Sequence, residues 1–316
     1  MKTVSILDTD ITSSNLGNEI IMQAVYEVLY ELFPNDFLIK IQCQDHLGPL
    51  SKKYIKQSHL SFIGGSNLLT SQMNSYKQIG FSFRDSFSIQ HMILLGVGWW
   101  QYQESPNAYT KIFLKNLLSK EIIHSVRDEY SKDKLNSLGL SNVLNTSCPS
   151  TWNLTEAHCK LIPSCRSSSV VFTITDYSLD SKSDIQFIDL LTDIYDNVFF
   201  WPQGLNDLNY LNSLTFKGKN TIKIIPPTLY AFDELLVNSD IDYIGTRLHG
   251  GIRAIQKKRR SLILAIDNRA EEISADIGLM VCKRDALCEI KSFIDDEYET
   301  SLRIPFKNIN TWKAQF

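Results

Sequence analysis

The stretch "IDYIGTRLHGGIRAIQKKRR" (residues 241–260) joins a short apolar run to an amphipathic segment. Leu248, Ile252 and Ile255 lie at positions i, i+4 and i+7, so they predict one buried helix face and leave His249 on an adjoining side. A buried strand that leads directly into a helix is the repeating unit of a parallel sheet covered by helices. The stretch therefore predicts an α/β fold with polar groups at a strand-to-helix junction.

The same alternation of strand and helix patterns extends over the whole chain. The first series of expected strands is "VSIL", "FLIKIQ", "LSFIGG", "HMILLGVG" and "IIHSV". The second series is "SVVFTIT", "NVFFWPQ", "TIKIIPP", "DIDYIGT" and "SLILAI". Residues 16–33 carry apolar side chains at helical spacing, which predicts a helix after the first strand. Two such series predict two Rossmann-like, doubly wound domains.

The boundary between the two domains is expected near residue 160. A chain of 316 residues is longer than one core usually supports. Residues 148–169, "CPSTWNLTEAHCKLIPSCRSSS", combine prolines with a serine cluster and lack sustained periodicity. We therefore predict an N-terminal domain over 1–160 and a C-terminal domain over 161–316, facing each other across a cleft. Ligands of doubly wound sheets bind at the carboxyl ends of the strands.

Composition narrows the classes of partner. The net charge of −3 and the pI near 6.1 provide no positive field for nucleic acid. The six cysteines are scattered and form no Cys-x-x-Cys pair, so neither a disulfide framework nor a zinc ribbon is indicated. No metal-ligand spacing such as His-Glu-x-x-His occurs either. We expect reduced cysteines, no metal and no nucleic-acid partner.

Hydropathy indicates a cytoplasmic protein. The N-terminal apolar run in "MKTVSILDTD" is too short for a signal peptide, and no later run approaches membrane-spanning length. The basic cluster at 257–260 is typical of a solvated helix end, where cations complement the helix dipole. The same four residues leave peripheral contact with the inner face of a membrane, or with a lipid-linked ligand, as an open alternative.

Polar and small residues follow several of the expected strands. The first strand-to-helix turn holds four polar side chains that suit sugar hydroxyls and are also ordinary loop and cap residues: Asp8, Asp10, Asn15 and Asn18. In "GGSNLL", Gly65 permits either a close ligand approach or a tight turn. Ser66 or Asn67 is expected to cap a following helix. In "SVRDEY", Asp128 is placed to cap a helix and to pair with Arg127.

The opening stretch is more specific than these turns. His249 lies in the first turn of the expected helix, where unpaired backbone N–H groups and the positive dipole end favour an anion. Arg247 precedes the helix and adds a planar fork that suits a carboxylate or phosphate. Gly250 and Gly251 are expected to leave room for a ligand. This combination favours a functional site over a structural one.

Taken in order, six segments resemble the polysaccharide pyruvyl transferase family: "NLGNEII", "GGSNLL", "GVGW", "SVRDEYSKDKLNSLGL", "GTRLHGGIRAI" and "AIDNRAEEISADIGL". The resemblance implies a GT-B-like fold. It also implies transfer of pyruvate, as a ketal, from phosphoenolpyruvate to a sugar of a surface polysaccharide or its precursor, with release of phosphate. Phosphoenolpyruvate is then a donor substrate, and no cofactor or metal is required because arginines and the helix dipole neutralise the leaving phosphate.

The resemblance also suggests roles for individual residues. The C-terminal domain is expected to bind phosphoenolpyruvate through Arg247, Leu248, Gly250 and Arg269. His249 is expected to be the general acid, since imidazole exchanges protons near neutral pH. Asp8 or Asp10 in the N-terminal domain would accept the hydroxyl proton. The acceptor is expected to contact Asn15, Asn18, Gly65 and Ser66.

Two departures from the family pattern support other hypotheses. The segment "VFTITDYSLD" lacks the basic residue that often follows this strand, and a common Lys is replaced by Arg269. One alternative is a GT-B glycosyltransferase, similar to sialyltransferases, that uses a nucleotide sugar. Another is a non-catalytic carbohydrate-binding protein, against which the intact Arg247 and His249 argue. Whether the acceptor is lipid-linked, nucleotide-linked or polymeric stays open.

Overall fold

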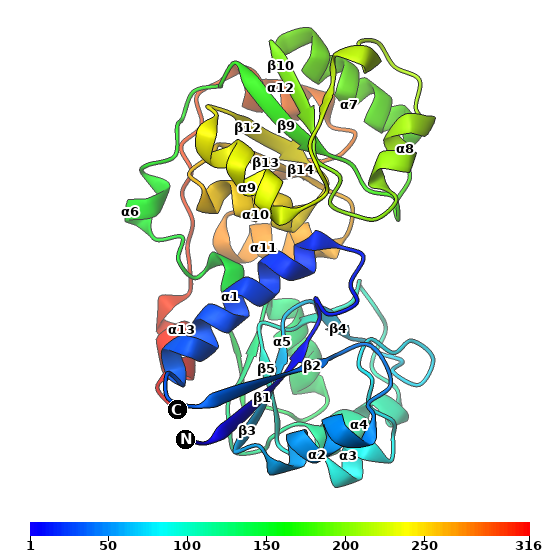
Figure 1. The fold of residues 1–316 in the computed structure, drawn as a ribbon, viewed down its shortest axis with the longest axis vertical. Helices are drawn as coiled ribbons and strands as arrows, with labels where there is room; N and C mark the ends of the chain where they lie inside the picture. The colour runs from blue at the N-terminus through cyan, green and yellow to red at the C-terminus, as the bar shows by residue number, and fades with distance from the viewer. The chain divides into compact units, whose positions relative to one another are not determined.

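The computed structural model describes all residues, 1–316, and the chain divides into two compact units (Figure 1). Unit 1 comprises Met1–Ser13, Ile21–Trp152 and Ile304–Phe316. Unit 2 comprises Ser14–Ile20 and Asn153–Arg303. The boundary expected near residue 160 thus falls between residues 152 and 153. In addition, Ser14–Ile20 belongs to unit 2 and Ile304–Phe316 belongs to unit 1, which the sequence did not predict.

Unit 1 is built on a parallel sheet. Its main strands are β1 (Thr3–Asp8), β2 (Phe37–Gln42), β3 (Leu60–Gly64) and β5 (Met92–Leu95), in the order β2-β1-β3-β5. A second parallel pair, β7 (His124–Val126) with β8 (Val143–Asn145), adjoins β5 through a bridge between Val97 and Val126. The chain moves outward in both directions from the β1–β3 pair, so the switch point of unit 1 lies between these two strands.

The remaining elements of unit 1 surround this sheet (Figure 1). They are α1 (Leu16–Leu32), which begins in unit 2, α2 (Pro49–Gln57), β4 (Asn67–Leu69), α3 (Asp85–Ser88), β6 (Gly98–Trp99), α4 (Ala108–Leu117), α5 (Glu129–Ser137), a 3-10 turn (Pro149–Thr151) and α13 (Phe306–Lys313). The segment after Ser66 is the short strand β4, so the expected helix cap at "GGSNLL" was wrong. The cap at Asp128 is confirmed, because its carboxylate accepts the Ser131 N–H at 2.7 Å.

The last residues of the chain belong to unit 1 because they complete its aromatic core. Trp312 is fully buried, and its ring centroid lies 6.3 Å from that of Phe62 and 5.9 Å from that of Trp152. The ammonium of Lys313 lies 2.6 Å from a carboxylate oxygen of Glu31 in α1. Residues 304–316 lack any sequence pattern that would assign them to the N-terminal series, and this packing explains the difference from the expected division.

Unit 2 contains a six-stranded parallel sheet in the order β11-β10-β9-β12-β13-β14. Its elements are α6 (Glu156–Cys159), β9 (Ser169–Thr173), α7 (Ser181–Ile194), β10 (Asn197–Phe200), α8 (Asp207–Ser213), a 3-10 turn (Lys219–Thr221), β11 (Lys223–Ile224), α9 (Leu229–Asn238), β12 (Asp242–Gly245), α10 (Leu248–Gln256), β13 (Ser261–Ala265), α11 (Asn268–Ile277), β14 (Val281–Lys283) and α12 (Leu287–Asp295). This is the doubly wound order, with its switch point between β9 and β12.

The basic cluster at 257–260 is less solvated than expected. Arg260 is 1% exposed, and its guanidinium lies 3.3 Å from the Asp242 carboxylate and donates to the Asp296 carbonyl at 2.8 Å. Lys257 pairs with Asp233 on α9, and Arg259 donates to the Leu236 carbonyl. These side chains tie α10 and β13 to their neighbours within unit 2.

Candidate functional site

The carboxyl edge of the unit 2 sheet gathers most of the predicted donor-side residues. Arg247 and His249 follow β12, and Arg269 follows β13. The loop after β9 adds Asp176 and Tyr177, which the sequence reasoning did not assign a role. Since β9 and β12 are hydrogen-bonded neighbours at the switch point, this edge is where a doubly wound sheet binds ligands.

Arg247 is a buried cation held by carboxylates. It is 3% exposed, and its Nε donates to Asp207 Oδ2 at 3.0 Å. Its Nη2 donates to Asp176 Oδ1 at 3.0 Å and also to Asp207 Oδ1. Arg247 is the N-cap residue of α10, where the helix dipole opposes a positive charge. The two carboxylates offset this repulsion and fix the orientation of the guanidinium.

Asp207 is the more deeply placed of these carboxylates. It is fully buried at the start of α8, and it also accepts the backbone N–H of Gly204 at 2.7 Å and of Asp176 at 3.1 Å. Burial is the largest effect and raises the pKa of Asp207 above its ordinary value, while the charge of Arg247 and the hydrogen bonds to the carboxylate offset part of this rise. The ion pair and the backbone donors favour the carboxylate form, so Asp207 positions both Arg247 and the loop after β9.

Arg269 lies in the first turn of α11 and is paired with the N-cap residue of its own helix. Its Nε donates to both oxygens of Asp267 at 3.0 Å, and its Nη2 donates to the hydroxyl of Tyr177. The ring centroid of Tyr177 lies 5.8 Å from Cζ of Arg269 and 5.0 Å from Cζ of Arg247. The loop "TDY", which lacks the basic residue of the family pattern, therefore contacts both arginines instead.

His249 lies in the first turn of α10, as predicted, and is 4% exposed. Its neighbour Leu248 is also buried. The space beside the two glycines was misjudged, because protein atoms fill it. A Cβ on Gly250 would lie 2.9 Å from the Tyr243 hydroxyl, and one on Gly251 would lie 2.6 Å from the Ile263 side chain. The glycines let α10 pack closely on β12 and β13. Gly250 could therefore contact a ligand only through its backbone atoms.

Three further side chains at this edge are buried and have no protein hydrogen-bond partner. They are the hydroxyls of Thr175 and Thr246 and the amide of Asn268, which follow β9, β12 and β13. Buried polar groups in folded proteins are nearly always hydrogen-bonded, because desolvating them otherwise costs free energy. These groups therefore mark a place suited to a polar ligand. The signal in the sequence was their position immediately after strands.

At the carboxyl edge of the unit 1 sheet, Asp8 ends β1 and is 4% exposed. Its Oδ1 accepts the Asp10 N–H at 2.7 Å, and its Oδ2 accepts the hydroxyl of Tyr26. Burial and the Asp8 carboxylate raise the pKa of Tyr26, so the phenol stays protonated and donates. The ammonium of Lys40 lies 3.8 Å from the Tyr26 ring centroid. Tyr26 is a residue of this edge that the sequence reasoning missed.

Gly65 and Ser66 form the turn after β3 at the same edge of unit 1. Both have a positive φ, +56° for Gly65 and +61° for Ser66. A Cβ on Gly65 would lie 2.1 Å from the Ile21 side chain of α1. The turn and the close approach of α1 thus both require a glycine at position 65. The predicted contact of Gly65 and Ser66 with the acceptor remains a prediction.

Asn15 and Asn18 lie in the short segment that belongs to unit 2, whereas the sequence placed them in the N-terminal domain. Asn15 Oδ1 accepts the Gln203 amide at 2.9 Å, and the Leu16 N–H donates to the Gln203 carbonyl at 3.0 Å. The Asn18 N–H donates to the Asn15 carbonyl at 3.0 Å, which forms the first turn of α1. Asn15 therefore lies with Gln203, which follows β10, whereas Asn18 lies in the first turn of α1.

Arg127 at the end of β7 is 1% exposed and lies within the core of unit 1. Its Nε lies 3.2 Å from Asp128 Oδ2, and its Nη2 donates to Asn67 Oδ1 at 2.6 Å. The expected structural pairing of Arg127 with Asp128 is confirmed.

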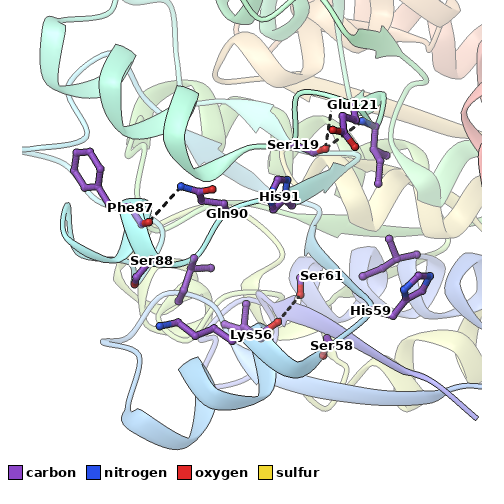
Figure 2. Close-up of a pocket in the computed structure, with 14 residues that line it drawn as sticks. Lys56, Ser58, His59, Ser61, Phe87, Ser88, Gln90, His91, Ser119 and Glu121 are labelled. Carbon is purple, nitrogen blue, oxygen red and sulfur yellow. Dashed lines mark hydrogen bonds between the residues drawn. The ribbon is translucent and has the colours of Figure 1, made fainter.

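A pocket of about 460 Å³ opens at the opposite, amino-terminal edge of the unit 1 sheet (Figure 2). Residues from the loops before β3, β5 and β7 line it, among them His59, His91 and Glu121. It contains none of the predicted site residues. The buried Arg247, His249 and the unpartnered polar groups lie instead at the carboxyl edge of the unit 2 sheet.

Two features of the whole chain concern membrane-spanning helices and metal sites. None of the helices is both long and apolar enough to span a bilayer. No group of three or more His, Cys, Asp or Glu side chains is arranged to hold a metal ion.

Solved structures with the same fold include sugar-nucleotide enzymes. UDP-GlcNAc 2-epimerase from Methanocaldococcus jannaschii, in complex with UDP-GlcNAc and UDP, has a TM-score of 0.55 and 14% identity, over 100% of this chain and 98% of that chain. The S. aureus MnaA–UDP co-structure has a TM-score of 0.56 and 12% identity, over 94% of this chain and 88% of that chain. These similarities confirm the predicted GT-B-like α/β fold.

No curated protein sequence matches the chain. The family model described as polysaccharide pyruvyl transferase matches residues 15–268. The matched region contains Arg247, His249 and Asn268, and it ends one residue before Arg269. Because the match covers most of the sequence, the chain belongs to the polysaccharide pyruvyl transferase family.

Proposed function

We propose that the protein transfers the pyruvyl group of phosphoenolpyruvate to two hydroxyls of a sugar in a surface polysaccharide or its precursor, forming a ketal and releasing phosphate. The observation that carries the proposal is the grouping of Arg247, His249 and the unpartnered Asn268 at the switch point of unit 2, inside the region matched by the family model. Family membership supports transferase activity. The donor and acceptor are our inference.

The donor is assigned to the carboxyl edge of unit 2. Arg247 and Arg269 supply the positive charge for its carboxylate and phosphate groups. The first turn of α10 adds backbone N–H groups, since Arg247 makes no side-chain cap there. The hydroxyls of Thr175 and Thr246 supply neutral donors. Preorganised donors of this kind stabilise the charge that develops on a leaving phosphate.

The reaction needs a proton on the methylene carbon of the donor. We assign this step to His249, which adds the proton and converts the methylene to a methyl group while the neighbouring carbon becomes oxocarbenium-like. The first sugar hydroxyl bonds to that carbon and loses its proton to a carboxylate. The second hydroxyl then bonds to the same carbon, and the bond between this carbon and the phosphate oxygen breaks, so that phosphate leaves. Of the two protons released, one restores His249 and the other leaves on phosphate.

For the acceptor proton we favour Asp10 over Asp8. Both oxygens of Asp8 already accept hydrogen bonds, from the Asp10 N–H and the Tyr26 hydroxyl, so this carboxylate is held by the turn and by α1. Asp10 is only half-buried. In this proposal Asp8 positions the turn and Asp10 takes the proton, while Asn15, Asn18, Gly65 and Ser66 contact the acceptor.

The donor also places the protein in the cytoplasm, where phosphoenolpyruvate is made. Peripheral contact with the inner face of a membrane follows if the acceptor is lipid-linked. No cofactor or metal enters the proposed reaction.

The proposal is tested by incubating the full chain with phosphoenolpyruvate and a panel of bacterial-type sugar acceptors. Phosphate release and the acceptor mass are measured together. We expect one acceptor to gain the mass of a pyruvate ketal in step with phosphate release. If sugar transfer occurs with a nucleotide sugar and phosphoenolpyruvate is not consumed, the glycosyltransferase alternative is correct. If neither donor is used and the sugars only bind, the protein is a carbohydrate-binding protein.

A further inference from the structure

The proposed donor site does not carry a net positive charge in this structure. Its two arginines face three carboxylates: Asp176 and Asp207 contact Arg247, and Asp267 contacts Arg269. Two cations and three anions leave these five side chains with a formal charge of −1. A multiply charged anion would meet arginines that are already paired through Nε and Nη2, and it gains full access to these donors only by replacing one of the carboxylates.

Asp207 and Asp267 are each fixed by additional contacts. Asp207 is fully buried and accepts two backbone N–H groups besides pairing with Arg247. Asp267 accepts the Arg269 N–H as the N-cap of α11, so its displacement would also uncap that helix. Neither carboxylate can leave its arginine without losing hydrogen bonds of the fold.

Asp176 is bound differently. Its side chain is 24% exposed, and its contact with Arg247 is a single one, from Oδ1 to Nη2 at 3.0 Å. The backbone of this residue is held separately, because its N–H donates to Asp207 Oδ1 at 3.1 Å. The carboxylate can therefore rotate away from Arg247 while the loop stays attached to Asp207.

We propose that Asp176 occupies, on Arg247, the position that an anionic group of the donor takes on binding, so that Asp176 is an intramolecular competitor of the donor. This inference rests on the proposed function and deepens it, because it names the residue that sets donor affinity. A buried guanidinium needs a counter-charge when no ligand is bound, and Asp176 contributes it. The same carboxylate returns to Arg247 after turnover and promotes release of phosphate.

The segment "VFTITDYSLD", which lacks the basic residue of the family pattern, contains the acid Asp176. Tyr177 follows it and lies over both arginines, at 5.0 Å from Arg247 Cζ and 5.8 Å from Arg269 Cζ. Tyr177 is 52% exposed, so its ring lies between solvent and these two cations' neighbourhood at the edge of the sheet.

The test is a titration of the full chain with phosphoenolpyruvate and, separately, with inorganic phosphate. Asp176→Asn keeps the shape of the side chain but removes its charge, so we expect the Kd of both anions to fall about fivefold, which is the size of a partly exposed ion pair. Asp176→Ala is the second charge-removing variant, and Asp176→Glu should restore the wild-type affinity. With an active acceptor, KM for the donor should fall in Asp176→Asn, while product inhibition by phosphate becomes stronger.

Two further variants test whether the gain in anion affinity is specific to the loss of charge at Asp176. Asp193→Asn removes one negative charge from the exposed face of α7 and should leave both affinities unchanged. Asp207→Asn disturbs the orientation of Arg247, so it should weaken anion binding, opposite to Asp176→Asn.

The outcomes separate this inference from the proposed function. If Asp176→Asn binds both anions no more tightly than wild type, or if no form of the protein binds either anion, the competitor role is overturned. If phosphoenolpyruvate binds no form but inorganic phosphate binds Asp176→Asn about fivefold more tightly than wild type, the competitor role stands and the donor assignment fails.

Discussion

Arg247 and Asp207 form a buried ion pair between the end of β12 and the start of α8, with 3.0 Å between Nε and Oδ2 and exposures of 3% and 0%. Removing one partner of such a pair leaves a buried charge without compensation. We expect Asp207→Ala to reduce the free energy of unfolding by about 3–5 kcal/mol, as measured by urea denaturation. Asp193→Ala, at an exposed position of α7, should change the free energy of unfolding by less than about 0.5 kcal/mol. Equal effects of the two variants would contradict a structural role for this pair.

The turn after β3 gives a second prediction, for unit 1. Gly65→Ala places a Cβ within 2.1 Å of Ile21 in a backbone conformation with φ of +56°, so we expect a loss of more than about 1 kcal/mol of unfolding free energy. Gly48→Ala is the matched control, because a Cβ there meets nothing within 4 Å and φ is −70°. If both variants have the stability of wild type, α1 does not pack against the turn as described.

His124 gives the pH prediction. Burial lowers its pKa to about 4 from an ordinary value of 6.5, and the hydrogen bond with the Ser119 carbonyl raises it by a smaller amount. Between these two pH values the unfolded chain binds the proton and the folded chain does not. The stabilisation is therefore fully present above pH 6.5 and is lost as the pH falls towards 4.

The expected loss is about 3 kcal/mol of unfolding free energy over that pH range. It is measured as the difference between wild type and His124→Gln, since other groups titrate in both proteins. The variant should show a flatter profile below pH 6.5. Parallel profiles would mean that His124 is protonated in the folded protein.

Much of the fold was predictable from the sequence because strand periodicity is local. The strand over 37–42 coincides with the expected "FLIKIQ", and α1 ends one residue before the expected Phe33. The short strands β4, β6, β8 and β14 were missed, whereas β7 and β11, which are equally short, were predicted because they lie in the longer apolar runs "IIHSV" and "TIKIIPP". The return of residues 304–316 to unit 1 was missed for another reason, because it depends on contacts of Trp312 with residues far away in the sequence.

The positions of the site residues were easier to predict than their partners. Arg247 and His249 lie at the predicted strand-to-helix junction because their positions follow from the apolar face of α10. The carboxylates of Asp176 and Asp207 could not be assigned to Arg247, since Asp176 lies in the loop after β9 and Asp207 begins the helix after β10. The room expected beside Gly250 was misjudged for the same reason, because Tyr243 and Gln203 fill it.

The most direct measurement of the central claim compares His249→Gln with wild type for both phosphoenolpyruvate affinity and turnover at saturating donor. Gln retains a hydrogen-bonding side chain of similar reach but cannot donate a titratable proton. We expect donor affinity close to that of wild type and a loss of turnover on the order of a hundredfold or more, the usual contribution of a positioned general acid. A strong loss of donor affinity with near wild-type turnover at saturation would contradict the account, because His249 would then bind the donor and the acid would be another residue.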